Sequence, residues 1–119
     1  MQRFMLKSKI HRATVTDSDL HYEGSISIDE RLMKAADLNC YERVDVYNVM
    51  NGERFSTYVL PGPQDSGTIC LNGAAARKVS RGDLIIVASY VMANDADCSD
   101  WIPKNVFVDE KNRITPKSL

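Results

Sequence analysis

The dipeptide Asn51-Gly52 places the strongest local constraint on the fold of this chain. It separates two runs rich in β-branched and aromatic residues, 43–50 and 53–60. A two-residue connection of this composition is typical of a β-hairpin closed by a type I′ turn, because both turn positions need a positive φ. The sequence therefore predicts two adjacent antiparallel strands in the middle of the chain.

Other short apolar runs extend this β pattern in both directions. Strands are expected over 2–7, 10–16, 68–71, 84–92 and 102–108. The fourth of these runs is almost entirely apolar, and we expect both of its faces to be buried.

One helix is expected over 29–38, where Asp29 can act as the N-cap. The tail after Glu110 is expected to fray. Many short strands with one or two short helices predict a mainly β fold, a small β-barrel, rather than an open α/β sheet.

Composition narrows the class of protein. A length of 119 residues suits one domain, 1–119. Lys and Arg total 15 against 16 Asp and Glu, so the net charge is −1. This balance argues against a nucleic-acid partner, because nucleic-acid-binding modules carry a basic excess. The longest apolar stretch, 84–93, is well short of the roughly 20 residues that a membrane span needs, so no membrane partner is expected.

Three cysteines occur, and their number is odd. Cys40, Cys70 and Cys98 are widely spaced and form no CxxC pair. The N-terminus also lacks the apolar region of a signal peptide. These features indicate free thiols in a reducing compartment and favour a cytoplasmic location.

Standard site motifs are absent from the sequence, including phosphate-binding glycine loops and the serine-hydrolase elbow. His11 and His21 lack the neighbouring Cys or Asp pattern typical of zinc, so no metal site is expected. Taken alone, Gly24-Ser25 is an ordinary turn dipeptide.

Several motifs, read in order, resemble the aspartate 1-decarboxylase family. They are Met5–Thr16, Asp19–Ser25, Asn51-Gly52, Arg54, Thr57-Tyr58, Asn72–Ala76 and Gly82–Val87. The resemblance covers nearly the whole chain. It implies a small six-stranded double-psi β-barrel with short helices, assembled as a homotetramer with active sites between neighbouring subunits.

The resemblance also implies that the chain cuts itself between Gly24 and Ser25 into segments 1–24 and 25–119. Ser25 would become a covalent pyruvoyl group, the cofactor that replaces pyridoxal phosphate, and no metal would be needed. Glycine at 24 is expected because a residue without Cβ tolerates a strained turn. Thr57 is implied as the donor to the oxyanion that forms at the Gly24 carbonyl.

The reaction implied by the resemblance converts L-aspartate to β-alanine and CO₂ for pantothenate and coenzyme A biosynthesis. The pyruvoyl ketone would form a Schiff base with the substrate amine and accept electrons as CO₂ leaves. Tyr58 is implied as the proton donor, because a phenol keeps its proton at neutral pH.

Other residues are implied to contact the substrate. Those implied to bind it are Lys9, Arg54, Thr57, Asn72, Gly73, Ala74 and Ala75, with His11, Tyr22 and Tyr47 lining the pocket. The planar guanidinium of Arg54 matches a carboxylate bidentately. Strand alternation puts Arg54 and Tyr58 on one face, and it puts Thr57 on the other unless the strand is bulged.

Two alternatives remain open at the level of the sequence. The chain could be a non-catalytic β-barrel binding protein in which Gly24-Ser25 stays intact. It could also be an uncleaved precursor that awaits an acetyltransferase-like activator. Intact mass separates both from a self-processed enzyme.

Overall fold

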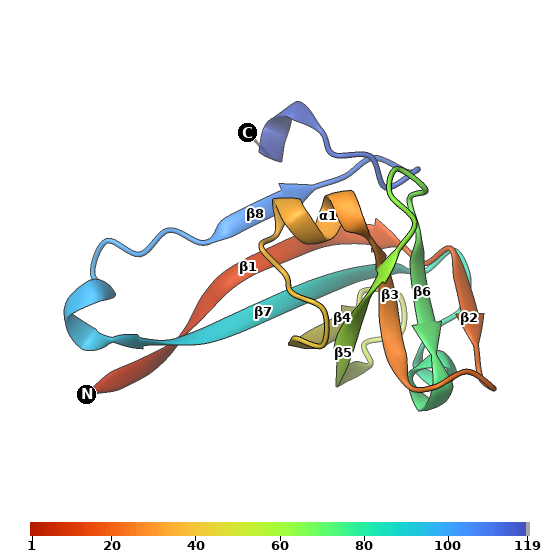
Figure 1. The fold of residues 1–119 in the computed structure, drawn as a ribbon, viewed down its shortest axis with the longest axis horizontal. Coiled ribbons are helices and arrows are strands. Elements are labelled where there is room, and N and C mark those ends of the chain that lie inside the picture. Colours follow the sequence, from red (N-terminus) through yellow and green to blue (C-terminus); the bar gives the residue numbers. More distant parts are fainter. Residues whose placement is uncertain (119) are drawn as a thin grey trace.

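The computed structural model describes residues 1–118, and strands dominate it (Figure 1). The strands are β1 (Gln2–Thr14), β2 (Asp17–Asp19), β3 (Ser25–Asp29), β4 (Arg43–Asn48), β5 (Arg54–Gly62), β6 (Ile69–Asn72), β7 (Leu84–Asn94) and β8 (Lys104–Phe107). The helical segments are α1 (Glu30–Ala35) and the short 3₁₀ turns η1 (Gly73–Lys78), η2 (Asp95–Asp97) and η3 (Pro116–Ser118). The expected mainly β class is confirmed.

The strands form one sheet that curls back on itself. Within residues 1–118 its order is β2-β6-β3-β5-β4-β7-β1-β8. There are thus eight strands rather than six, because the short β2 and β8 add a strand at each end. Only Val15 and Thr16 separate β1 from β2, so the two ends of the sheet must meet. The backbone N–H of Thr16 donates to the Ile69 carbonyl of β6 (2.8 Å), which extends the β2–β6 pairing back to the residues that follow β1.

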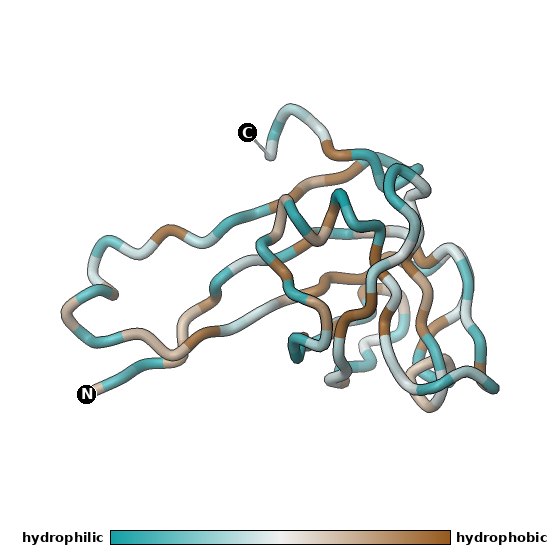
Figure 2. Tube along the Cα trace, viewed as in Figure 1, coloured by the Kyte–Doolittle hydropathy of each residue, from teal (hydrophilic) through white to brown (hydrophobic). Residues whose placement is uncertain are grey.

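Apolar side chains from alternate strand positions fill the barrel. Figure 2 shows where hydrophobic residues, in brown, occur along the chain. Ile10, Val46 and Val87 form one row across β1, β7 and β4 and are at most 1 % exposed. The expectation that all of 84–92 is buried is wrong for its second half. Tyr90 and Met92 are 46 % and 53 % exposed, because β7 continues past the barrel beside β1 as a projecting arm.

Backbone irregularities explain other differences from the expected strands. The run 2–7 and the first five residues of the run 10–16 belong to the single strand β1, whose register against β7 shifts at two places. At the second shift Arg12 has a φ of +57°, which breaks the apolar alternation. Strand β3 was not expected from the sequence.

The central hairpin exists, but its turn is wider than expected. Gly52 has a φ of +76°, whereas Asn51 has no positive φ, so the turn is not type I′. The backbone N–H of Gly52 donates to the Asn48 carbonyl (2.9 Å). Side-chain oxygens of Asn48 and Asn51 accept from the backbone N–H groups of Met50 and Glu53, and these local bonds favour the wider turn.

Helix α1 is shorter than the expected 29–38. Asp29 is its N-cap, as predicted, and its carboxylate accepts from the Arg31 backbone N–H (2.9 Å). The helix ends early because Asp37 adopts a φ of +55° and the Leu38 N–H donates to the Met33 carbonyl (2.8 Å). This is a Schellman-type end.

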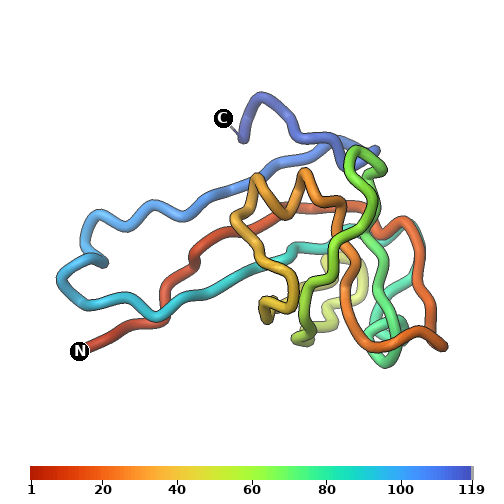
Figure 3. The backbone as a smooth tube through the Cα atoms, viewed as in Figure 1, coloured from red at the N-terminus to blue at the C-terminus, as the bar shows by residue number. Residues whose placement is uncertain are grey.

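Residues 111–118 of the tail do not fray, contrary to expectation, and Leu119 lies outside the described residues. Asn112 is only 2 % exposed, and its amide bonds both backbone groups of Thr14 and the carbonyl of Gly67, each at 2.8 Å. A bridge between Val108 and Ile114 folds the segment back along β8 (Figure 3). Within residues 1–118, no helix is long and apolar enough to cross a bilayer.

Candidate functional site

Ser25 is the first residue of β3 and lies at the end of the turn that follows β2. Its side chain is completely buried, whereas the preceding Gly24 is exposed. The Oγ atom of Ser25 accepts a hydrogen bond from the Asn72 side-chain amide (3.0 Å) and donates a longer one to the Glu23 carbonyl (3.4 Å). The hydroxyl is thus held directly beside the Gly24–Ser25 peptide bond.

Asn72 lies opposite Ser25 because β3 and β6 pair in antiparallel register. It is 3 % exposed, and its Nδ2 donates to both Ser25 Oγ and Ser27 Oγ (3.0 and 3.1 Å). Its Oδ1 accepts from the thiol of Cys70 (3.2 Å). The side-chain amide therefore presents its NH₂ to the two serine hydroxyls.

Gly73 follows directly and starts η1, the helical turn expected after Asn72. It has a φ of +64°, and a Cβ placed there would lie 2.7 Å from the Gly24 N and Cα atoms. Only glycine therefore fits at this position. Ala75 is buried in the same turn, whereas Ala74 is exposed.

Gly24 itself differs from its expected geometry. Its φ is not positive, and a Cβ on it would meet nothing within 4 Å. The strained glycine of the site is therefore Gly73. The missing Cβ of Gly73 leaves room for the N and Cα atoms of Gly24, which allows the two segments to lie in contact.

A second group of candidates lies on the sheet face that points away from the core. Arg54 and Tyr58 share this face of β5 by alternation, and the regular β4–β5 register contains no bulge. The Arg54 guanidinium lies 3.8 Å from the centre of the Tyr47 ring. Lys9 and His11 share the same face through β7, since Lys9 pairs with Ala88 and Ala88 pairs with Asp45.

Electrostatics keep two members of this face neutral. Burial, followed by the hydrogen bond with Tyr90, raises the pKa of Tyr47 to about 12. Burial and the nearby charge of Lys9 lower the pKa of His11 below its ordinary 6.5, so the imidazole is neutral near pH 7. The positive charges on this face include Arg54, Lys9 and Arg43, which pairs with Tyr58 on β5.

The register of the sheet relates the two groups through Tyr58. Strands β3 and β5 pair in parallel, and their first pair is Ile26 with Val59. Ser25 and Tyr58 each precede this pair by one residue, so they lie at the same level of the sheet. Thr57 pairs with the buried Val44 and faces the core side. Within residues 1–118, no hydrogen bond joins Thr57 to Gly24 or Ser25.

The comparison with known proteins bears on this arrangement. The family model described as aspartate decarboxylase matches residues 1–115. The chain belongs to the aspartate decarboxylase family.

Curated relatives support the same assignment along nearly their whole length. An aspartate 1-decarboxylase of Syntrophus aciditrophicus is 68 % identical over 114 residues, which cover 96 % of this chain and 98 % of the relative. That of Syntrophobacter fumaroxidans is 59 % identical over 119 residues, covering 100 % and 96 %. That of Methylibium petroleiphilum is 56 % identical over 114 residues, covering 96 % and 95 %.

The sequence of this member of the aspartate decarboxylase family did not lead us to expect two residues of the site. Ser27 and Cys70 are paired across β3 and β6, two pairs along from Ser25 and Asn72 and therefore on the same face. The period-two spacing of Ser25 with Ser27 and of Cys70 with Asn72 is the signal that could have identified them. Because strand β3 is not predicted from the sequence, this spacing does not indicate that Ser25 and Ser27 share a face.

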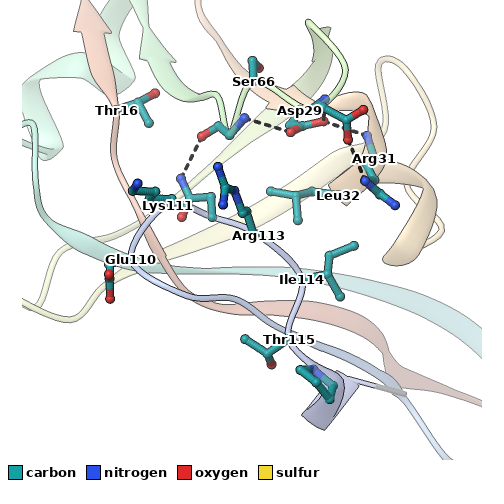
Figure 4. Close-up of a pocket in the computed structure, with 14 residues that line it drawn as sticks. Thr16, Asp29, Arg31, Leu32, Ser66, Glu110, Lys111, Arg113, Ile114 and Thr115 are labelled. Carbon is teal, nitrogen blue, oxygen red and sulfur yellow. Dashed lines mark hydrogen bonds and ion pairs between the residues drawn. The ribbon is translucent and has the colours of Figure 1, made fainter.

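The larger of two cavities lies away from these residues. It has a volume of about 940 Å³ and lies between α1, the 65–67 turn and the C-terminal segment (Figure 4). The smaller one, of about 420 Å³, lies between the arm and β4 and is lined in part by Phe4, Asp45 and Tyr90. Ser25 lines neither of them. Among residues 1–118, no group of three His, Cys, Asp or Glu residues is placed to hold a metal ion.

Proposed function

We propose that this protein decarboxylates L-aspartate to β-alanine and CO₂ after cutting itself between Gly24 and Ser25. The observation that carries the proposal is the buried Ser25 hydroxyl, held by Asn72 next to the peptide bond that would break. Membership of the aspartate decarboxylase family favours this enzyme over a non-catalytic binding protein of the same fold.

The cleavage starts with the Ser25 hydroxyl. Its Oγ adds to the Gly24 carbonyl carbon, its proton passes to the Ser25 nitrogen, and the peptide C–N bond breaks. An ester and a free amine result. Loss of the Ser25 Cα proton and of the Cβ–Oγ bond then releases the Gly24 carboxylate and leaves dehydroalanine. Water replaces its nitrogen, which yields a pyruvoyl group and ammonia.

The donor set around Ser25 fits such a group. The Asn72 amide points at the position of Oγ, and the absence of a Cβ at Gly73 leaves backbone free to contact the new terminus. A pyruvoyl group held there by Asn72 and the Gly73 backbone would supply an electron sink for the loss of CO₂. No metal and no pyridoxal phosphate enter the proposal.

The exposed sheet face supplies the remaining functions. We assign the Arg54 guanidinium, stacked on Tyr47, to a substrate carboxylate, with Lys9 as a second positive charge. Tyr58 lies at the level of Ser25 and is the proposed proton donor to the decarboxylated carbon. Thr57 is proposed to stabilise the cleavage oxyanion, which requires its hydroxyl to turn toward Gly24.

The proposed assembly is a homotetramer. Phe4, Tyr90 and Met92 lie on one face of the β1–β7 arm and are 76 %, 46 % and 53 % exposed. Tyr90 also bonds the Tyr47 hydroxyl (2.8 Å), so this apolar face continues into the face that carries Arg54. Covering it with another copy would close the site. An acetyltransferase-like activator of cleavage and a cytoplasmic location complete the proposal, and the free cysteines fit a reducing compartment.

The function is tested by following β-alanine formation from L-aspartate with three proteins. The unchanged chain and Ser27→Ala are expected to form product, and Ser25→Ala is expected to fold, stay whole and form none. Ser27 is the matched control because it bonds the same amide. Product formation by Ser25→Ala would refute the assignment.

A further inference from the structure

A partly buried chain of hydrogen bonds leads from the thiol of Cys70 to the hydroxyl of Ser25. The Cys70 Sγ donates to Asn72 Oδ1 (3.2 Å), and Asn72 Nδ2 donates to Ser25 Oγ (3.0 Å) and Ser27 Oγ (3.1 Å). Among residues 1–118, the thiol is the only donor to this Oδ1. All four residues share one face of the β3–β6 pair, because Ser25 pairs with Asn72 and Ser27 pairs with Cys70.

The side-chain amide of Asn72 could in principle take two orientations. Reversed, its oxygen would accept protons from the serine hydroxyls, and its NH₂ would face sulfur, which is a weak acceptor. When the Cys70 thiol acts as a donor, it favours the orientation in which Asn72 Oδ1 faces sulfur and the NH₂ faces the serines. Burial, with the charges of Asp17 and Asp19 on β2, raises the pKa of Cys70, so the thiol keeps its proton.

Orientation matters to the chemistry at Ser25 Oγ. When Oγ accepts from Asn72, its own proton is held only by the longer bond to the Glu23 carbonyl (3.4 Å), from which it can pass to the Ser25 nitrogen. Later the same Oγ becomes part of the leaving carboxylate of Gly24, and an N–H donor stabilises the negative charge that develops there. A reversed amide would tie up the proton in the first step and repel the charge in the second.

We propose that Cys70 is a positioning residue for self-cleavage, which fixes the Asn72 amide with its NH₂ toward Ser25. This inference rests on the proposed function and adds to it a residue that never touches the breaking bond. It requires only that position 70 carry a hydrogen-bond donor of similar size.

The first test measures the rate of cleavage by intact mass in Cys70→Ala and Cys70→Ser. Loss of one orienting hydrogen bond is expected to slow Cys70→Ala about 3- to 10-fold, whereas the hydroxyl of Cys70→Ser restores the rate to within about 2-fold. Cys40→Ala, which removes an exposed thiol elsewhere, is the matched control and is expected to cleave normally. Equal rates in Cys70→Ala and the unchanged chain, or equal slowing in both Cys70 variants, would overturn the inference.

A second measurement does not depend on cleavage. In the uncleavable Ser25→Ala chain, the Asn72 side-chain amide still donates to Ser27, and its ¹⁵N signals report its orientation. Adding Cys70→Ala is expected to shift these signals and speed their hydrogen exchange, and Cys70→Ser is expected to preserve them. Unchanged signals with Cys70→Ala would overturn the inference. Failure of the unchanged chain to cleave would instead refute the proposed function, and these signals would still decide the role of Cys70.

Discussion

At the residue scale, Gly73 and Gly24 meet backbone to backbone but depend differently on being glycine. Gly73 has a left-handed φ and no room for a Cβ, whereas Gly24 has open space. The sequence motif marks both, and reasoning from the cleavage chemistry alone placed the strain at Gly24. The contact with Gly73 comes from the β3–β6 pairing, which is not visible in the local sequence.

We predict that Gly73→Ala disrupts this contact. The added Cβ would collide with Gly24. The alanine backbone would also have to keep a positive φ, which costs about 1–3 kcal/mol. Thermal unfolding should show a lower Tm, and intact mass should show slower cleavage. Gly24→Ala is the control for folding and should keep its Tm. Equal Tm values for the two variants would contradict the account.

Replacement of Tyr58 separates cleavage from turnover. Tyr58→Phe is expected to cleave normally, because the phenol takes no part in the acyl shift, yet to lose about 100-fold or more in kcat. Intact mass and steady-state β-alanine formation measure the two effects. Tyr41→Phe alters the neighbouring ring, whose centre is 6.2 Å away, and should retain turnover. Full turnover by Tyr58→Phe would mean that another acid supplies the proton.

At the element scale, Glu42 ties the segment before β4 to β1 and β7. Its carboxylate accepts from Lys7 Nζ (2.8 Å) and Ser89 Oγ (2.5 Å). Burial alone would raise the pKa of Glu42, but these hydrogen bonds outweigh burial and lower the pKa below its ordinary 4.5. The charged carboxylate is thus favoured in the folded state.

The stabilisation by Glu42 is therefore expected to depend on pH. A carboxyl group with a lowered folded pKa stabilises the fold above its unfolded value of 4.5, and this stability is lost as the pH falls through the folded pKa. Glu42→Gln should lower the Tm near neutral pH, and the difference should shrink toward low pH. Thermal unfolding across pH measures it, with the exposed Asp100→Asn as control. A difference independent of pH would contradict this reasoning.

The strands were more predictable than their ends. Alternation identified β4 and β5, because each places apolar residues on one face. The turn between them was mistaken because Asn48 and Asn51 bond nearby backbone, and the ordered tail was missed because Asn112 bonds Thr14, 98 residues away. Such long-range contacts leave no local pattern in the sequence.

At the scale of the whole molecule, the candidate residues divide into a cleavage group around Ser25 and a charged face around Arg54. The motif order predicted both sets, but their separation by strand and face required the sheet order. The arm beside this face exposes apolar side chains that a second copy would cover.

Removing this apolar surface should weaken assembly. Met92→Ser is expected to shift the molecular mass in solution from a tetramer toward smaller species, because an exposed apolar side chain would no longer be buried between copies. Sedimentation equilibrium measures the change. Ile102→Ser, which removes another exposed apolar side chain outside the arm strands, is the control. A chain that is already monomeric without substitution would contradict the proposed assembly.

Intact mass spectrometry of protein that is actively forming β-alanine tests the central claim most directly. The account predicts two fragments, residues 1–24 and residues 25–119, the second lacking a free amino terminus and carrying a pyruvoyl group in place of Ser25. A fully active preparation with a single unbroken chain and an intact Ser25 would contradict it.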